Sequence, residues 1–138
     1  MTKEFIYTKM REYRLAVLAT VTEGIQPEAA LVGFAVTPDL EIVFDTVRTS
    51  RKYNNLLVCP RVALVIGWKN ETSIQYEGMA RELGAGEGVE YKEAYYAVYP
   101  DGMQRAAEWE GLTHFVVRPS WIRYSNFNPP AVIEELTL

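Results

Sequence analysis

The stretch that decides the fold spans residues 41–58 and reads EIVFDTVRTSRKYNNLLV. Its apolar, β-branched beginning predicts a strand over Glu41–Asp45. From Lys52 the pattern changes to about two helical turns, which Pro60 ends because proline lacks a backbone N–H and cannot continue a helix. Ser50 is the predicted N-cap of this short helix, because its hydroxyl can accept a hydrogen bond from a free backbone N–H.

Two cations fall in the first turn of this predicted helix. The helix macrodipole is positive there, so Arg51 and Lys52 are repelled unless an anion lies between them and the helix end. Two interpretations stay open from the residues alone. The cations extend into water, as at many strand-to-helix connections, or they bind an anion together with the hydroxyls of Thr46, Thr49 and Ser50. We favour the second hypothesis, with a phosphate as the anion.

Composition limits the classes of partner. The chain has 138 residues, 49% of them hydrophobic and 23% charged, which predicts one globular domain over residues 1–138. Its net charge of −4 argues against nucleic acid or an anionic membrane surface as the main partner. No apolar run approaches the ~18 residues of a membrane helix, and the beginning, MTKE, lacks the apolar segment of a signal peptide. We therefore expect a cytoplasmic protein.

About seven short strands are predicted along the chain. Those over residues 14–22, 29–36 and 40–44 are joined by turns too short for crossover helices, so we predict an antiparallel meander. The other strands are predicted over residues 61–68, 73–83, 114–118 and 121–125, and the helices over 3–13, 52–58, 89–99 and 101–111. A final apolar piece, Ala131–Leu136, is expected to pack on the body or on a partner chain. A closed or nearly closed β-barrel with peripheral helices fits best, because closure removes strand edges.

Two glycines interrupt predicted strands. Gly78 predicts a β-bulge. Gly33 is typical of a bulge, of a tight barrel bend, or of a flat ligand that lies against the backbone, and the residues alone leave these alternatives open.

Few residues offer acid–base or nucleophilic chemistry. The single cysteine, Cys59, is interpreted as a small buried residue, and the single histidine, His114, as structural. The chain has no Cys/His cluster for zinc, no nucleophile elbow and no Gly-rich phosphate-binding motif of known spacing. A chain of this kind with a loop ready for phosphate takes its chemistry from a cofactor.

Several ordered segments carry a resemblance to a known family. They are Leu18-Ala19-Thr20-Val21, Gln26-Pro27, Val43-Phe44-Asp45-Thr46, Ser50-Arg51-Lys52 and Cys59-Pro60-Arg61-Val62-Ala63-Leu64. Together they resemble the pyridoxamine 5'-phosphate oxidase-like family, and the smaller general-stress-protein-like members in particular. The resemblance implies a mainly β fold, the antiparallel FMN-binding split β-barrel, with peripheral helices.

The resemblance also implies a set of FMN-binding residues. They are Ala30, Leu31, Val32, Gly33, Asp45, Thr46, Ser50, Arg51, Lys52 and Ser73. Of these, Thr46 and residues 50–52 would hold the phosphate, and the backbone of residues 30–33 would lie along the flavin ring. The family is typically a homodimer with two flavins at the subunit interface, so the tyrosine-rich helix 89–99 and the region of Trp109 are candidates to serve the partner's site.

Three positions depart from the true pyridoxamine 5'-phosphate oxidases. Those enzymes have Arg at the position of Ala30, Lys at that of Ala35, and Gln at that of Ser73. Alanine supplies neither the charge nor the hydrogen bonds, so we do not expect pyridoxine oxidation. We expect an FMN-dependent oxidoreductase whose substrate is undefined. Two alternatives stay open: a protein of the same fold that binds a deazaflavin, or haem with His114 as ligand, and a non-enzymatic flavin-binding stress or sensor module.

Overall fold

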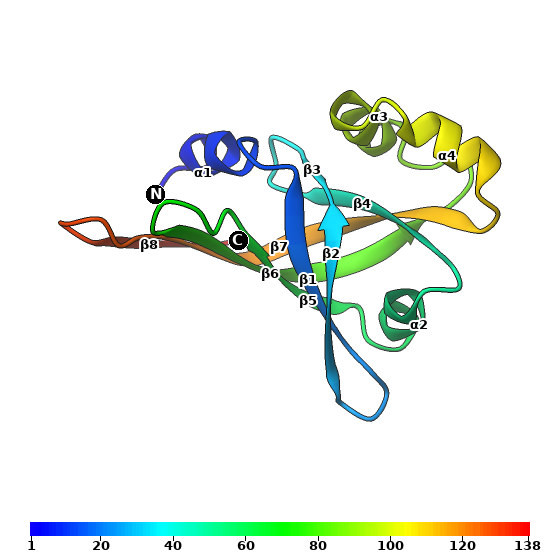
Figure 1. The fold of residues 1–138 in the computed structure, drawn as a ribbon, viewed down its shortest axis with the longest axis horizontal. Coiled ribbons are helices and arrows are strands. Elements are labelled where there is room, and N and C mark those ends of the chain that lie inside the picture. The colour runs from blue at the N-terminus through cyan, green and yellow to red at the C-terminus, as the bar shows by residue number, and fades with distance from the viewer.

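A computed structural model describes all residues from Met1 to Leu138 (Figure 1). In chain order its elements are α1 (Lys3–Met10), β1 (Leu15–Val21), β2 (Pro27–Gly33), β3 (Ala35–Val36), β4 (Ile42–Val47), α2 (Arg51–Val58), β5 (Arg61–Ile66), β6 (Thr72–Leu83), α3 (Val89–Val98), α4 (Gly102–Glu108), β7 (Leu112–Asn126) and β8 (Val132–Thr137). Every strand pairing is antiparallel. The predicted class, mainly β and antiparallel with peripheral helices, is therefore confirmed.

The strands form one curled sheet in the order β2-β1-β5-β6-β7-β4-β3, with β8 paired to β7. Strands β2 and β3 are consecutive in the chain but lie at opposite ends of this order, so the sheet must curl until its two ends approach each other. The break between them is Phe34, whose N–H donates to the Arg14 carbonyl at 3.1 Å and whose side chain is buried. The antiparallel pairing of chain neighbours predicted for the meander is present, since β1 pairs with β2 and β3 with β4, but the predicted single strand 29–36 is broken at Phe34 into β2 and β3.

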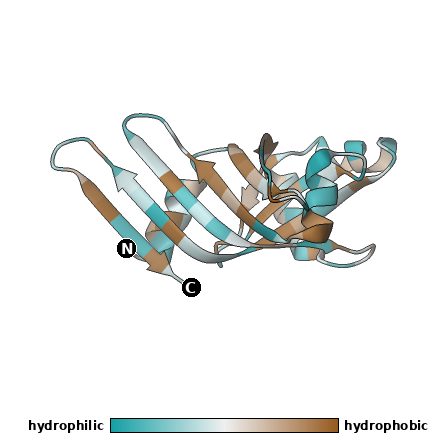
Figure 2. Cartoon of the chain, turned by 90° about the horizontal axis from the view of Figure 1, so that it is seen from below, coloured by the Kyte–Doolittle hydropathy of each residue, from teal (hydrophilic) through white to brown (hydrophobic).

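The main hydrophobic core fills the inside of the curl. Residues of β5 alternate, with Val62, Leu64 and Ile66 buried and the residues between them exposed, as a strand with one face on a core requires. The core also receives side chains from α1 and α2. In Figure 2 apolar segments lie along the strands, and on several strands they alternate with hydrophilic ones. The curl of the sheet is therefore stabilised from inside by apolar burial.

A second, smaller core lies on the outside of the sheet under α3. Ala35, Val43, Leu83 and Val116 from the strands meet Tyr95 of α3 there. Figure 1 shows α3 and α4 together above this end of the sheet. Strand β4 is thus buried on both faces, which explains why its sequence begins with an unbroken apolar run.

Strand β7 is a single strand of 15 residues where two were predicted. Its register against β6 shifts between Glu77 and Gly78, so that Gly78 faces Pro119 while Glu77 faces Trp121. A bulge lies opposite Gly78, but its extra residue is Ser120 of β7, so the bulge is on the partner strand and not in the strand of Gly78 as predicted. It lets β7 continue past a proline that cannot donate a ladder hydrogen bond. The second half of β7 pairs with β8, which confirms that the final segment packs on the body.

Several helices end earlier than predicted. Helix α1 ends at Met10, and α4 ends at Glu108, so Trp109 follows the helix and is 52% exposed. Cys59 is only half-buried, not buried as predicted, because it caps the C-terminus of α2 near the surface. None of the helices combines the length and the apolar character that crossing a membrane would require.

Candidate functional site

The N-terminus of α2 gathers hydrogen-bond donors. Ser50 has extended backbone angles, and its Oγ accepts from the Tyr53 N–H at 3.3 Å, which confirms the predicted N-cap. The hydroxyls of Thr46 and Ser50 are 2.9 Å apart and hydrogen-bonded. Arg51 and Lys52 are the first two helical residues, so their own N–H groups have no partner inside the helix. This helix end presents hydroxyls, amides and cations from one short segment.

A pocket of about 210 Å³ opens beside this helix end. It is lined by Thr20, Glu28, Ala29, Ala30, Arg51 and Lys52. Strand β2 and helix α2, which are far apart in the sequence, therefore meet at one cavity. The structure brings Ala30 together with Arg51 and Lys52, as the resemblance implied.

Lys52 is half-buried at the edge of this pocket. Burial lowers the pKa of its ammonium group, and the negative charge of Asp45 opposes part of that shift. Lys52 forms none of the ion pairs of the structure. A partly desolvated cation without a partner is stabilised by any anion that enters the pocket.

Glu28 is a site residue that the sequence reasoning missed. Its carboxylate forms an ion pair with the Arg51 guanidinium, and its side chain is only 17% exposed. Its Oε1 also accepts from Asn55 Nδ2 at 2.8 Å. The same amide nitrogen donates to Thr20 Oγ1 at 2.9 Å. A signal was available, because the strand alternation that turns Ala30 toward the pocket also turns residue 28 toward it.

Asp45 lies on the opposite face of β4 from Thr46. Its carboxylate pairs with Arg105 of α4 at 3.4 Å, outside the barrel. Neighbouring residues of a strand point to opposite faces, so the structure does not bring Asp45 to the pocket with Ala30, Arg51 and Lys52.

The remaining predicted residues lie farther along the sheet. The Leu31 side chain is 60% exposed on the outer face, whereas Val32 is buried in the core. A Cβ atom on Gly33 would lie 2.6 Å from the Tyr99 hydroxyl oxygen, so the close approach at this glycine is made by Tyr99. Ser73 precedes Ile74, which aligns through β5 and β1 with Val32. It therefore lies at the other end of β2 from the pocket.

The tyrosines of α3 pack on the sheet around His114. The ring centroids of Tyr95 and Tyr96 lie 5.5 and 5.7 Å from the His114 ring, both edge-on. The imidazole is 5% exposed, and its Nε2 has no hydrogen-bond partner. Burial lowers its pKa, Asp45 opposes the shift, and Lys92 and Arg105 add to it. His114 is therefore an enclosed side chain whose neutral form burial favours, in line with the structural interpretation.

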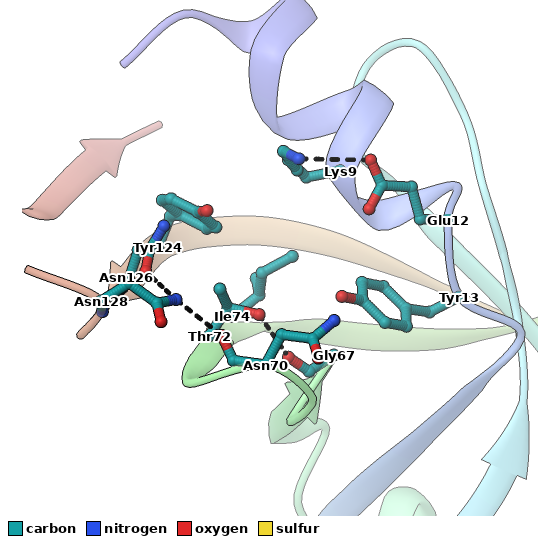
Figure 3. Close-up of a pocket in the computed structure, with 10 residues that line it drawn as sticks. All are labelled: Lys9, Glu12, Tyr13, Gly67, Asn70, Thr72, Ile74, Tyr124, Asn126 and Asn128. Atoms are coloured by element: carbon teal, nitrogen blue, oxygen red, sulfur yellow. Dashed lines mark hydrogen bonds and ion pairs between the residues drawn. The ribbon is translucent and has the colours of Figure 1, made fainter.

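A second polar pocket, of about 250 Å³, lies under α1 and contains none of the predicted site residues (Figure 3). Its polar groups largely bind one another. Lys9 pairs with Glu12 at 3.3 Å, and the Asn128 amide donates to Asn126 Oδ1 at 2.8 Å and to the Asn70 carbonyl at 2.9 Å. These bonds fasten the β5–β6 turn to the β7–β8 loop, which is a structural role.

The outer face of the first three strands of the sheet is apolar and uncovered. Leu15, Leu31 and Val65 are 46%, 60% and 40% exposed, and Val17 is half-buried. Val17 aligns with Leu31 on one side and with Val65 on the other, so these side chains form one continuous patch. We call the patch formed by these four residues the apolar sheet face. It borders the α2 pocket through β2.

Comparison with known proteins bears on the family and the fold of the chain. The family model of pyridoxamine 5'-phosphate oxidase matches residues 2–126. No curated protein sequence matches the chain significantly.

Solved structures with the same fold include proteins described as binding different cofactors, FMN in one and haem in another. The general stress protein 26 of Bacillus anthracis superposes with a TM-score of 0.69 at 23% identity, over 99% of this chain and 98% of that one. A pyridoxamine 5'-phosphate oxidase-related, FMN-binding protein of Nostoc punctiforme gives 0.66 at 11% identity, over 99% and 92%. A haem-binding protein of Mycobacterium smegmatis gives 0.79 at 15% identity, and the match covers 99% of this chain but 58% of that protein. These likenesses establish the fold.

Proposed function

Because the chain belongs to the pyridoxamine 5'-phosphate oxidase-like family, we propose that it is a flavoprotein that binds FMN with the phosphate at the N-terminus of α2. One observation carries this proposal: the pocket where Ala30 of β2 meets Arg51 and Lys52 of α2. A phosphate needs several donors and positive charge in one place, and a helix N-terminus with adjacent cations supplies both.

Each residue of the helix end has a proposed role. Arg51 and Lys52 neutralise the phosphate charge, and their free N–H groups donate to its oxygens. The bonded hydroxyls of Thr46 and Ser50 orient the first turn of α2 and offer further donors. The backbone of residues 30–33 is proposed to lie along the flavin ring. When bound, FMN would supply redox chemistry that the side chains lack, and the protein would act as an oxidoreductase.

The residues present fit a phosphate, with one exception. Lys52 is partly desolvated and unpaired, which favours an anion, whereas the Glu28 carboxylate opposes one.

Ala30 and Ala35 lack the cationic groups found at these positions in true pyridoxamine 5'-phosphate oxidases, so the proposed substrate is not a pyridoxine phosphate.

The proposed active form is a homodimer with the cofactor at the subunit interface. The apolar sheet face is a continuous patch that a monomer would leave in water, and such patches mark interaction sites. It adjoins the α2 pocket through β2, so a partner copy seated on this face would approach the proposed phosphate site.

The structure gives the haem alternative no ligand of the expected kind. That alternative requires the only histidine, His114, and its imidazole is enclosed by Tyr95 and Tyr96 with 5% exposure.

Whether the flavoprotein turns over is tested directly: reduction of the bound flavin by NADH or NADPH supports an oxidoreductase, and flavin binding without reduction supports a binding module.

The test of the proposal is FMN binding by the purified protein. We expect a flavin absorption spectrum after reconstitution and quenching of FMN fluorescence on titration. The double variant Arg51→Ala with Lys52→Ala should weaken FMN binding by about ten- to a hundredfold, because it removes two charge-assisted contacts. The matched control, Lys69→Ala with Arg81→Ala, removes the same charge outside the pocket and should bind as the parent does. Absence of FMN binding, or an unchanged affinity in the double variant, would contradict the proposal.

A further inference from the structure

We propose that Glu28 is a built-in counter-ion for Arg51, which the phosphate of a bound nucleotide-type cofactor must displace, and that it thereby sets the affinity of the site for phosphate esters. This inference rests on the proposed FMN function and identifies a residue that regulates it. The observation behind it is the carboxylate inside a pocket whose other charged groups are cations.

Both oxygens of Glu28 have partners in the structure. One oxygen pairs with the Arg51 guanidinium, and the other accepts from Asn55 Nδ2 at 2.8 Å. Asn55 is only 7% exposed, and its amide is anchored by a second hydrogen bond, to Thr20 Oγ1 at 2.9 Å. Asn55 therefore fixes the carboxylate at the mouth of the pocket, beside the first turn of α2.

The charge balance gives the direction of the effect. Without a ligand, Glu28 offsets the repulsion between Arg51 and the positive end of the helix. A phosphate monoester carries about −1.5 to −2 charges at pH 7, so it competes with Glu28 for the guanidinium and is repelled by the carboxylate that remains. A ligand without the phosphate has no such competition. Glu28 should therefore weaken binding of FMN and leave binding of riboflavin unchanged.

The experiment compares two ligands across two charge-neutralising variants of one hairpin. Glu28→Gln keeps the size of the side chain and removes its charge. The matched control, Glu23→Gln, makes the same change in the β1–β2 turn, where the side chain is exposed and unpaired in the structure. FMN and riboflavin dissociation constants are measured by fluorescence titration, and Glu28→Ala serves as a second variant if Glu28→Gln folds poorly by circular dichroism.

We expect Glu28→Gln to bind FMN about three- to tenfold more tightly than the parent, with riboflavin affinity unchanged and Glu23→Gln like the parent for both ligands. Unchanged FMN affinity in Glu28→Gln, together with weakened binding in the Arg51/Lys52 double variant, would overturn this inference and leave the proposed function standing. Weaker binding of both flavins in Glu28→Gln would overturn it too, because Glu28 would then be a ligand of the cofactor's hydroxyl groups. Failure of the parent and of both Glu28 variants to bind FMN would overturn the proposed function and the inference together.

Discussion

Asp45 and Thr46 are neighbours in the chain, yet their side chains have different surroundings. Thr46 bonds to Ser50 at the end of α2, while Asp45 pairs with Arg105 on the outside of the sheet. The same alternation places Glu28 and Ala30 on the side of the α2 pocket and Leu31 on the outer face. At this scale, one step along a strand decides which face of the sheet a side chain joins.

His114 gives a prediction at the residue scale. Its pKa in the folded protein is lowered by burial, so the unfolded chain binds a proton more readily. The contribution of this residue to stability is complete above about pH 6.5, the ordinary pKa of histidine, and is lost as the pH falls from there toward the lowered folded-state pKa. In His114→Phe, which keeps an aromatic ring between Tyr95 and Tyr96, this loss should disappear.

The measurement is chemical unfolding of both proteins between pH 7.5 and pH 5. The free energy of unfolding of the parent should fall more steeply than that of His114→Phe, by at most about 1.4 kcal/mol per pH unit, the slope for one proton. Parallel curves for the two proteins would show that His114 does not titrate differently on folding.

At the scale of elements, Glu82 of β6 fastens the end of α2 to the sheet. Its carboxylate accepts from Thr113 Oγ1 at 2.5 Å, from the Tyr53 hydroxyl at 3.0 Å and from Arg48 Nε at 3.3 Å. These donors belong to β7, to α2 and to the loop that joins β4 to α2. One side chain therefore fixes the helix end that carries Arg51 and Lys52.

The charge of Glu82 should matter for stability in a definite pH range. Burial alone would raise the pKa of its carboxyl, but the hydrogen bonds from Thr113, Tyr53 and Arg48 outweigh burial and lower the pKa. The stabilisation is therefore present above the ordinary pKa of glutamate, about 4.3, and is lost as the pH falls through the lower folded-state pKa.

We expect Glu82→Gln to lower the free energy of unfolding at pH 7 by about 1–3 kcal/mol, the range for hydrogen bonds to a charged group. The difference from the parent should shrink as the pH falls below 4. Thermal unfolding followed by circular dichroism at pH 7 and pH 3.5 checks both statements, and an equal loss at the two pH values would contradict the role given to the charge.

At the scale of the whole molecule, the apolar sheet face predicts self-association. Val65 is 40% exposed near the end of β5 and points away from the core, so Val65→Asp should leave the fold intact and place a charge inside the proposed interface. We expect the parent to be a dimer and Val65→Asp a monomer at micromolar concentration in light-scattering measurements. Val132→Asp makes the same change on β8, where Val132 is 41% exposed outside this face, and should remain dimeric. A monomeric parent would contradict the interface.

Local features could be predicted from the sequence, and long-range pairing could not. Residues a few positions away in the sequence determine three local features. These are the strand before residue 46, the N-cap at Ser50 and the placement of Arg51 and Lys52 in the first helical turn. The partner of a strand depends on the whole sheet, which is why residues 29–36 were assigned to one strand and β7 to two. The resemblance implied that Ala30, Arg51 and Lys52 belong to one site, and the structure places them at one pocket. Glu28 was missed because its contact with Arg51 exists only once β2 and α2 have met.

The placement of β2 and β3 at opposite ends of the sheet has a consequence for how the chain folds. The β1–β2 and β3–β4 hairpins are local and can form early, but Ile42 of β4, which pairs with Val36 of β3, finds its second partner only at Val117 of β7. Pairings of such high sequence separation slow folding, because the entropy of closing the loop precedes the gain from the contact. On the ribosome, the edge of β4 that pairs with β7 therefore stays unpaired until most of the chain has been synthesised, and an unpaired apolar strand edge is prone to aggregation during that time.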